Sequence, residues 1–169
     1  SYNSQLGVAL SLLMIEGDEQ VAIVEAGISH PDQMARLEEM IRPDVAIITN
    51  IGTQHAENFD SDEHKVCEKL TLARRAKMII YDGSIELIAK AVAELSAAKI
   101  DCREYSDTEN TKRDRSSQRA AEIVAALWCS MHCDSQEVRK RVQALRPLAM
   151  RMELKDGING SIILNDSSN

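Results

Sequence analysis

The sequence predicts an α/β fold in which a parallel sheet carries helices on both faces. Short apolar runs, typical of strands buried on both faces, alternate along the chain with longer segments of helical spacing. Such alternation is typical of parallel sheets. Apolar residues make up 44% of the 169 residues, which is enough for a core, and aromatic residues only 3%, so that core is aliphatic.

The first part of the chain predicts two helices and two strands. Residues 5–15 (QLGVALSLLMI) predict a buried helix, and the apolar run at 21–24 predicts a buried strand. Residues 31–41 begin with proline and have apolar side chains at helical spacing, and Pro43 ends that helix. The uninterrupted apolar run at 45–48 predicts the next strand.

The middle of the chain continues the alternation. Residues 49–60 predict a loop, and residues 62–76 a charged helix. A third strand is expected at 78–81, followed by a helix with alanine and leucine periodicity at 85–98. A fourth, weaker strand is expected at 100–105.

The last third of the chain has a different pattern. Residues 106–117 (SDTENTKRDRSS) are polar and highly charged, which predicts a loop or a disordered link. Two helices are expected at 118–131 and 136–145. Residues 151–154 and 161–164 flank a glycine-containing turn, so they predict a β-hairpin.

The charge and the cysteine content narrow the function classes. The 20 Lys and Arg against 27 Asp and Glu give a net charge of −7 and a pI near 5.1. This balance argues against general nucleic-acid binding, which needs a basic surface, but it leaves a nucleotide ligand open. No apolar run approaches the roughly 20 residues that span a bilayer, and we expect neither a signal peptide nor membrane insertion. The four cysteines are too sparse for a disulfide scaffold, which favours a reducing cytoplasm.

One short cluster could bind a metal. Cys129, His132 and Cys133 lie close together in the sequence, but late in an apolar helical pattern and without a second pair of ligands. The interpretation that competes with zinc is that the two thiols pack in or beside a core, and we favour it.

Three side chains are placed by the pattern where a parallel sheet binds ligands, beyond the carboxyl ends of its strands. Glu25 ends the strand predicted at 21–24, so it is either a Mg²⁺ ligand or a capping or salt-bridged acid. Asn50 and His55 follow the next strand, and a lone loop histidine is often simply solvated. Lys69 lies on the following helix, where a plain surface lysine is the competing interpretation. The sequence contains no G-x-x-x-x-G-K-[ST], G-x-G-x-x-G or G-x-S-x-G motif.

Four motifs in order resemble the Mur ligases. These are SYNSQLG at 1–7, VEAGIS at 24–29, TNIGTQH at 49–55 and NDSSN at 165–169. Within the family, the sequence is most similar to the ligases that join D-alanyl-D-alanine to UDP-N-acetylmuramoyl-tripeptide. The motif at 1–7 and residues 68–70 look like the subtype that is fused to an alanine racemase.

The resemblance implies an ATP-dependent ligase of peptidoglycan synthesis. The γ-phosphate of ATP would pass to the carboxylate of the UDP-linked tripeptide, and the amine of D-alanyl-D-alanine would attack the resulting acyl phosphate. Mg²⁺ would offset the negative charge of the phosphates. UDP-N-acetylmuramoyl-tripeptide and D-alanyl-D-alanine are thus the implied substrates.

The resemblance also implies roles for individual residues. Glu25 matches the family's Mg²⁺-binding glutamate, and His55 matches the histidine that helps to hold a second Mg²⁺. Lys69 matches a lysine that family members carry as a carbamate, which is an anion able to bind or orient groups near Mg²⁺. Asn3 and Asn50 match polar positions near the active site. Arg151 resembles the arginine at the start of the family's C-terminal domain, and Asp166 resembles the aspartate of that domain that contacts the nucleotide.

The resemblance divides the chain and leaves alternatives open. It assigns residues 1–147 to part of a central ATP-binding domain and 148–169 to the start of a C-terminal domain. The family's phosphate loop would lie upstream of Ser1, so we expect a piece of a longer ligase that is inactive alone. The alternatives are a non-catalytic α/β module that works by protein contact, and a related Mur or folylpolyglutamate-type ligase with a different acceptor.

Overall fold

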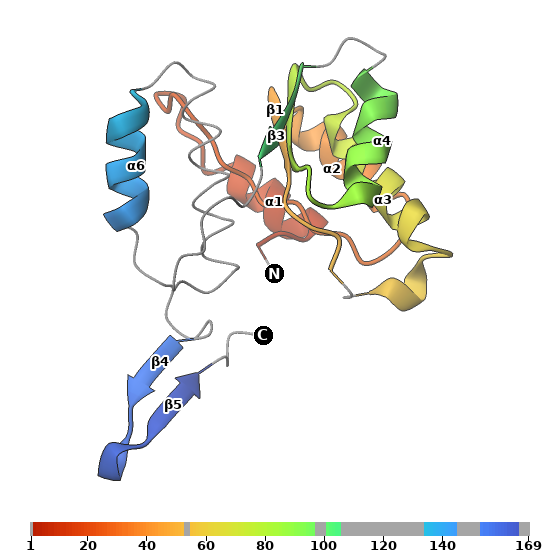
Figure 1. Cartoon of the computed structure of the whole chain (residues 1–169). Coiled ribbons are helices and arrows are strands. Elements are labelled where there is room, and N and C mark those ends of the chain that lie inside the picture. Colours follow the sequence, from red (N-terminus) through yellow and green to blue (C-terminus); the bar gives the residue numbers. More distant parts are fainter. Residues whose placement is uncertain (1, 53–54, 97–100, 106–133, 145–152, 166–169) are drawn as a thin grey trace. The chain divides into compact units, whose positions relative to one another are not determined.

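The computed structural model describes residues 2–52, 55–96, 101–105, 134–144 and 153–165 (Figure 1). The chain divides into two compact units, Ser1–Ser106 and Asp107–Asn169, and each is described by itself. The domain boundary predicted at residue 147 lies outside the described residues and stays a prediction.

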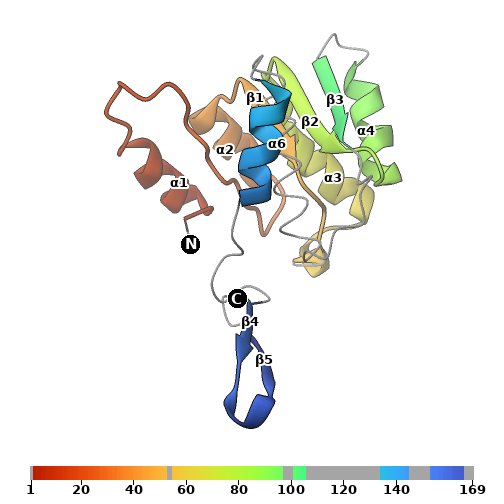
Figure 2. The ribbon, with the colours of Figure 1, turned by 60° about the vertical axis from the view of Figure 1, so that its left-hand side comes forward.

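A three-stranded parallel sheet forms the centre of the first unit. Its strands are β1 (Val45–Ile48), β2 (Met78–Asp82) and β3 (Asp101–Tyr105), in the order β1-β2-β3 (Figure 2). The register pairs Ile48 with Tyr81, so β1 and β2 end at the same edge of the sheet. The parallel α/β architecture that the sequence predicts is thereby confirmed.

Four helices accompany the sheet close to their predicted ranges: α1 (Gln5–Leu12), α2 (Gln33–Ile41), α3 (Asp62–Leu70) and α4 (Glu86–Ser96). The helix predicted at 62–76 continues beyond α3 only as a 3-10 turn, η2 (Thr71–Ala73). Serine side chains cap α1 and α3, because Ser4 accepts from the Gly7 amide and Ser61 from the His64 amide. α2 ends where Arg42 adopts a left-handed conformation, next to the predicted stop at Pro43.

The main core lies between the sheet and the α3–α4 layer. Ala46 and Ile48 of β1 and Ile79 of β2 share this face of the sheet, because alternate residues of a strand point the same way. Ile80, on the opposite face, is also fully buried, so both faces of β2 are covered. The other side of this core, from α3, η2, α4 and the segment before β2, consists of Val66, Leu70, Ala73, Ala76, Ile88 and Val92.

A second, smaller core joins α1 to α2. Val8 packs with Met34 and Leu37, and the partly buried Val24, Ala26 and Ile28 pack against them.

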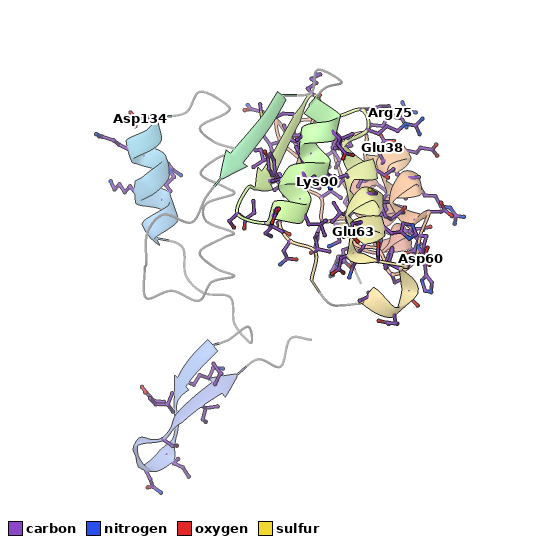
Figure 3. All side chains as sticks on the ribbon, turned by 45° about the vertical axis from the view of Figure 1, so that its right-hand side comes forward. Glu38, Asp60, Glu63, Arg75, Lys90 and Asp134 are labelled. Atoms are coloured by element: carbon purple, nitrogen blue, oxygen red, sulfur yellow. The ribbon has the colours of Figure 1, made fainter. Side chains whose placement is uncertain are left out.

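An ion pair fastens α2 to the segment after η2. The Glu38 carboxylate is 1% exposed and accepts two bonds from Arg75, at 2.8 Å from Nε and 2.6 Å from the terminal nitrogen. The two side chains point toward one another in Figure 3. This bidentate geometry is the strong form of an Arg–carboxylate contact.

The strand predicted at 21–24 is wrong. These residues have no regular secondary structure. Val21 and Ile23 are exposed, while Val24, Ala26 and Ile28 pack against the smaller core. A strand needs a paired neighbour, and in the described part of the chain this segment has none. Val24 therefore packs against α1 and α2 and not against a neighbouring strand.

The described part of the second unit contains a helix and a hairpin. α6 (Ser135–Ala144) confirms the helix predicted at 136–145. The strands β4 (Glu153–Asp156) and β5 (Ile162–Asn165) pair antiparallel around η3 (Ile158–Gly160), which confirms the hairpin. The predicted link at 106–117 and helix at 118–131 lie outside the described residues. Among the described helices, none is both long and apolar enough to cross a bilayer.

Candidate functional site

Glu25 is held by a residue from the start of the chain. Its Oε1 accepts a 2.9 Å hydrogen bond from Asn3 Nδ2, and the Asn3 carbonyl accepts one of 2.9 Å from the Gly27 amide. A Cβ on Gly27 would lie 3.0 Å from both Asn3 Cγ and Asn3 Nδ2, so this position suits glycine. The Glu25 side chain itself is exposed, which leaves its carboxylate open to a ligand.

The loop after β1 is held by two lysines of α3. Lys69 Nζ donates to the Asn50 carbonyl at 3.0 Å, and Lys65 Nζ donates to the Gly52 carbonyl at 2.9 Å. Residues four apart on a helix lie on the same face, so the two ammonium groups reach the same short loop. Lys65 is also near the buried Phe59, with Nζ 5.7 Å from the ring centroid.

The surroundings of Lys69 lower the pKa of its ammonium group. Its partial burial, which disfavours an ammonium, is the larger cause that lowers the pKa of Lys69. The positive charge of Lys65 lowers that pKa further. A larger share of Lys69 is therefore an unprotonated, nucleophilic amine than at an ordinary surface lysine.

His55 lies in the loop between β1 and α3. It is exposed, has a φ of 59° and precedes the 3-10 turn η1 (Ala56–Asn58). Asn58 Nδ2 donates to the Ser29 carbonyl at 2.9 Å, which ties this loop to the segment that follows Glu25. The loop that carries His55 is thus connected to the segment that carries Glu25.

Hydrogen bonds bring four of the predicted site residues together in two pairs. The structure joins Asn3 to Glu25 and Lys69 to Asn50. Within the described ranges, no group of three or more His, Cys, Asp or Glu side chains that could hold a metal ion is present. The remaining predicted positions, Arg151 and Asp166 and the cluster Cys129, His132 and Cys133, lie outside the described residues.

The sequence reasoning overlooked two residues of this region. Gly27 is needed for the close approach of Asn3, which no local pattern reveals. Lys65 is 2% exposed, although lysine is almost never fully buried. The signal for Lys65 was available, since it precedes Lys69 by four residues and adjoins Val66 on the apolar side of α3.

The fold and these contacts define a class of protein: an α/β domain with polar and charged groups collected beyond the carboxyl end of a parallel strand, where such sheets bind ligands. Residues 1–142 match the family model of the Mur ligase middle domain. The chain therefore belongs to the Mur ligase family.

Three relatives of the chain are named as ligases that act on UDP-N-acetylmuramoyl compounds. The UDP-N-acetylmuramoyl-tripeptide–D-alanyl-D-alanine ligase of Borreliella burgdorferi is 40% identical over 57 residues, covering 34% of this chain and 12% of the relative. The ligase of the same name from Bacillus subtilis is 30% identical over 94 residues, which cover 54% of this chain and 21% of the relative. The UDP-N-acetylmuramoylalanine–D-glutamate ligase of Pseudothermotoga lettingae is 26% identical over 144 residues, which cover 76% of this chain and 34% of the relative.

A solved structure confirms the fold. MurF from Acinetobacter baumannii superimposes with a TM-score of 0.76 at 17% identity, over 98% of this chain and 43% of that protein. The chain thus spans less than half the length of each of these relatives.

Proposed function

We propose that this chain is the central part of an ATP-dependent ligase that joins D-alanyl-D-alanine to UDP-N-acetylmuramoyl-tripeptide in peptidoglycan synthesis. The observation that carries the proposal is the middle-domain match over residues 1–142, together with two relatives named for this reaction. The 169 residues alone are expected to be inactive, because they span only part of those relatives.

The proposed reaction passes through an acyl phosphate. The γ-phosphate of ATP goes to the tripeptide carboxylate, the dipeptide amine attacks the activated carbonyl, and phosphate leaves as the amide forms. Bound Mg²⁺ would supply positive charge against the phosphate oxygens. Mg²⁺ is usually held by one or two carboxylates plus substrate phosphates, so an exposed carboxylate such as Glu25 fits it without a larger protein cage.

The described residues suit distinct parts in this scheme. Glu25 would bind the metal, with Asn3 fixing its orientation through Nδ2. His55 would help at a second metal position. Lys69 would act as a carbamate, and its lowered pKa favours the neutral amine that CO₂ addition requires. Arg151 and Asp166 would contact the nucleotide from the C-terminal part.

The acceptor is the least constrained part of the proposal. The match to the D-glutamate ligase covers more of this chain than the other two, which favours a ligase with a different acceptor as the second candidate. ADP release by the full-length protein separates the candidates. We expect release to require both UDP-N-acetylmuramoyl-tripeptide and D-alanyl-D-alanine. Release with UDP-N-acetylmuramoylalanine and D-glutamate in place of the tripeptide and the dipeptide would support the second candidate. No release with any substrate pair would favour a non-catalytic module.

Lys69→Ala tests the site within the same assay. We expect it to lose most of the activity, and an added short-chain carboxylate to restore part of it by standing in for the carbamate. Lys90→Ala, at an exposed lysine of α4, is the matched control and should keep full activity. Full activity of Lys69→Ala would remove Lys69 from the site. Glu25→Ala should likewise weaken Mg²⁺-dependent turnover far more than it weakens folding.

A further inference from the structure

A cavity of about 540 Å³ lies between α1, α2 and the segment after η2. Its volume is in the range of pockets that bind small molecules. None of the residues of the candidate functional site lines it. Half of the side chains in its wall are arginines, and the whole set is Gln5, Arg36, Glu39, Met40, Arg42 and Arg75.

The wall of this cavity carries a surplus of positive charge. Arg36 lies on α2, Arg42 ends it, and Arg75 comes from the segment after η2. Glu39 is the carboxylate in the wall, and the buried Glu38 is bound to Arg75 (Figure 3). Three guanidinium groups thus meet two carboxylates. Because the chain as a whole has a net charge of −7, this local surplus marks a place where an anion is favoured.

The arginines have hydrogen-bond donors to offer a ligand. Glu38 takes one bond from Nε and one from a terminal nitrogen of Arg75, and a guanidinium group has five N–H donors. Among the residues that the structure describes, none bonds or pairs with the guanidinium group of Arg36 or Arg42. The half-buried Gln5 adds a side-chain amide at the start of α1. Planar guanidinium groups match phosphate oxygens, and a phosphate group offers three of these and close to two negative charges.

Arg42 has a backbone conformation that glycine would adopt more easily. It ends α2 with a φ of 47°, and its amide donates to the Glu38 carbonyl at 2.8 Å. Glycine is the usual residue at such a helix end, because a side chain in the left-handed region costs free energy. What arginine adds here is a positive charge in the wall of the cavity.

We propose that Arg36, Arg42 and Arg75 form a binding site for a phosphate group, with Gln5 as a further donor. The ligand is a small anion, either inorganic phosphate or a phosphate monoester, since both present the same oxygens to the arginines. Arg75 is shared with Glu38, so Arg36 and Arg42 supply most of the binding. The site shares no residue with the candidate functional site, and the proposal does not depend on the proposed function.

The test is a titration of the full-length protein with inorganic phosphate, followed by NMR of the arginine side-chain Nε–H signals. This measurement reports each arginine by itself, so phosphate bound elsewhere does not interfere. We expect the signals of Arg36 and Arg42 to shift. The signal of Arg74, which is exposed and does not line the cavity, should stay unchanged.

Substitutions measure the contribution of each arginine. Arg36→Gln should weaken the phosphate affinity reported by the Arg42 signal about tenfold, and Arg42→Gln should do the same at the Arg36 signal, because each loses a hydrogen bond to a charged group. Arg74→Gln is the matched control and should bind as the wild type does. Circular dichroism checks folding, and both Arg36→Gln and Arg42→Gln leave the pair of Arg75 with Glu38 in place.

The outcomes identify the ligand or overturn the site. Methyl phosphate that binds as tightly as inorganic phosphate would assign the site to a phosphate ester, and much weaker binding would assign it to free phosphate. Equal phosphate affinity in Arg36→Gln, Arg42→Gln and the wild type would overturn the proposal. Shifts that chloride reproduces at the same ionic strength would overturn it as well. Shifts with an oligoglutamate peptide and with neither phosphate would replace it by an acidic protein partner.

Discussion

Replacing Gly27 with alanine perturbs the way in which Asn3 holds Glu25. Gly27 does not adopt the left-handed conformation that excludes other residues, so alanine introduces no backbone strain there. The new Cβ would instead lie 3.0 Å from Asn3 Cγ and Nδ2. Every expected effect of Gly27→Ala therefore passes through the Asn3 side chain.

The size of the expected effect of Gly27→Ala follows from these distances. Ordinary contacts of a Cβ begin at 3.4 Å, so the Asn3 amide must move away by about 0.4 Å. If the amide moves along its bond to Glu25 Oε1, this 2.9 Å bond lengthens to about 3.3 Å, beyond the usual range for an N–H···O hydrogen bond. A hydrogen bond at an exposed carboxylate contributes about 1 kcal/mol, which is roughly a fivefold effect on an equilibrium.

The assay is the Mg²⁺ dependence of ADP release by the full-length protein. Under the proposed function, Gly27→Ala should raise the Mg²⁺ concentration for half-maximal rate about fivefold, in line with effects of residues that orient metal ligands. Maximal rate should change less. Asn3→Ala should give a similar shift, and Gly27→Ala should add little to it, because the side chain that it displaces is already absent.

Two results would refute this reasoning. An unchanged Mg²⁺ dependence in Gly27→Ala would show that the Asn3–Glu25 bond does not orient the metal ligand. Fully additive effects of Gly27→Ala and Asn3→Ala would show that Gly27 acts by another route.

Two further predictions concern stability. Arg75→Met leaves the buried Glu38 carboxylate without its bidentate partner. It should lower the unfolding temperature of the full-length protein more than Lys77→Met, which breaks an ion pair with two exposed side chains. Equal decreases in the two variants would contradict this prediction. Ser61→Ala removes the side chain that caps α3 and should cost about 1 kcal/mol, measured as faster hydrogen exchange of the first amides of that helix, with exchange in α4 unchanged.

Much of the fold was predictable because its signals are local. The apolar run at 45–48 matches β1, and the helices α2 and α6 begin and end within a few residues of their predicted ranges. The run at 21–24 has the same apolar character as β1 and failed as a strand prediction. An apolar, β-branched composition favours a strand, but pairing depends on which segment lies beside it.

The candidate site also has a part that the sequence predicts and a part that depends on tertiary packing. Asn50 and His55 were predicted as site residues from their position after a strand, and β1 confirms that position. Glu25 was predicted from a strand at 21–24 that the structure does not contain, and Lys69 was predicted mainly from the family resemblance. The bond between Asn3 and Glu25 joins residues 22 apart, and that between Lys69 and Asn50 joins residues 19 apart. Such contacts exist only after the elements have packed.

The sequence by itself determined the fold class, the family resemblance and the residue types available for chemistry. Only the tertiary structure decided that Gly27 admits Asn3, and that Lys65 is buried beside Lys69. The physical reason is that burial and charge proximity are set by distant segments. In its helix alone Lys65 looks like a surface residue, but in the folded protein it is buried and bonded to the loop after β1.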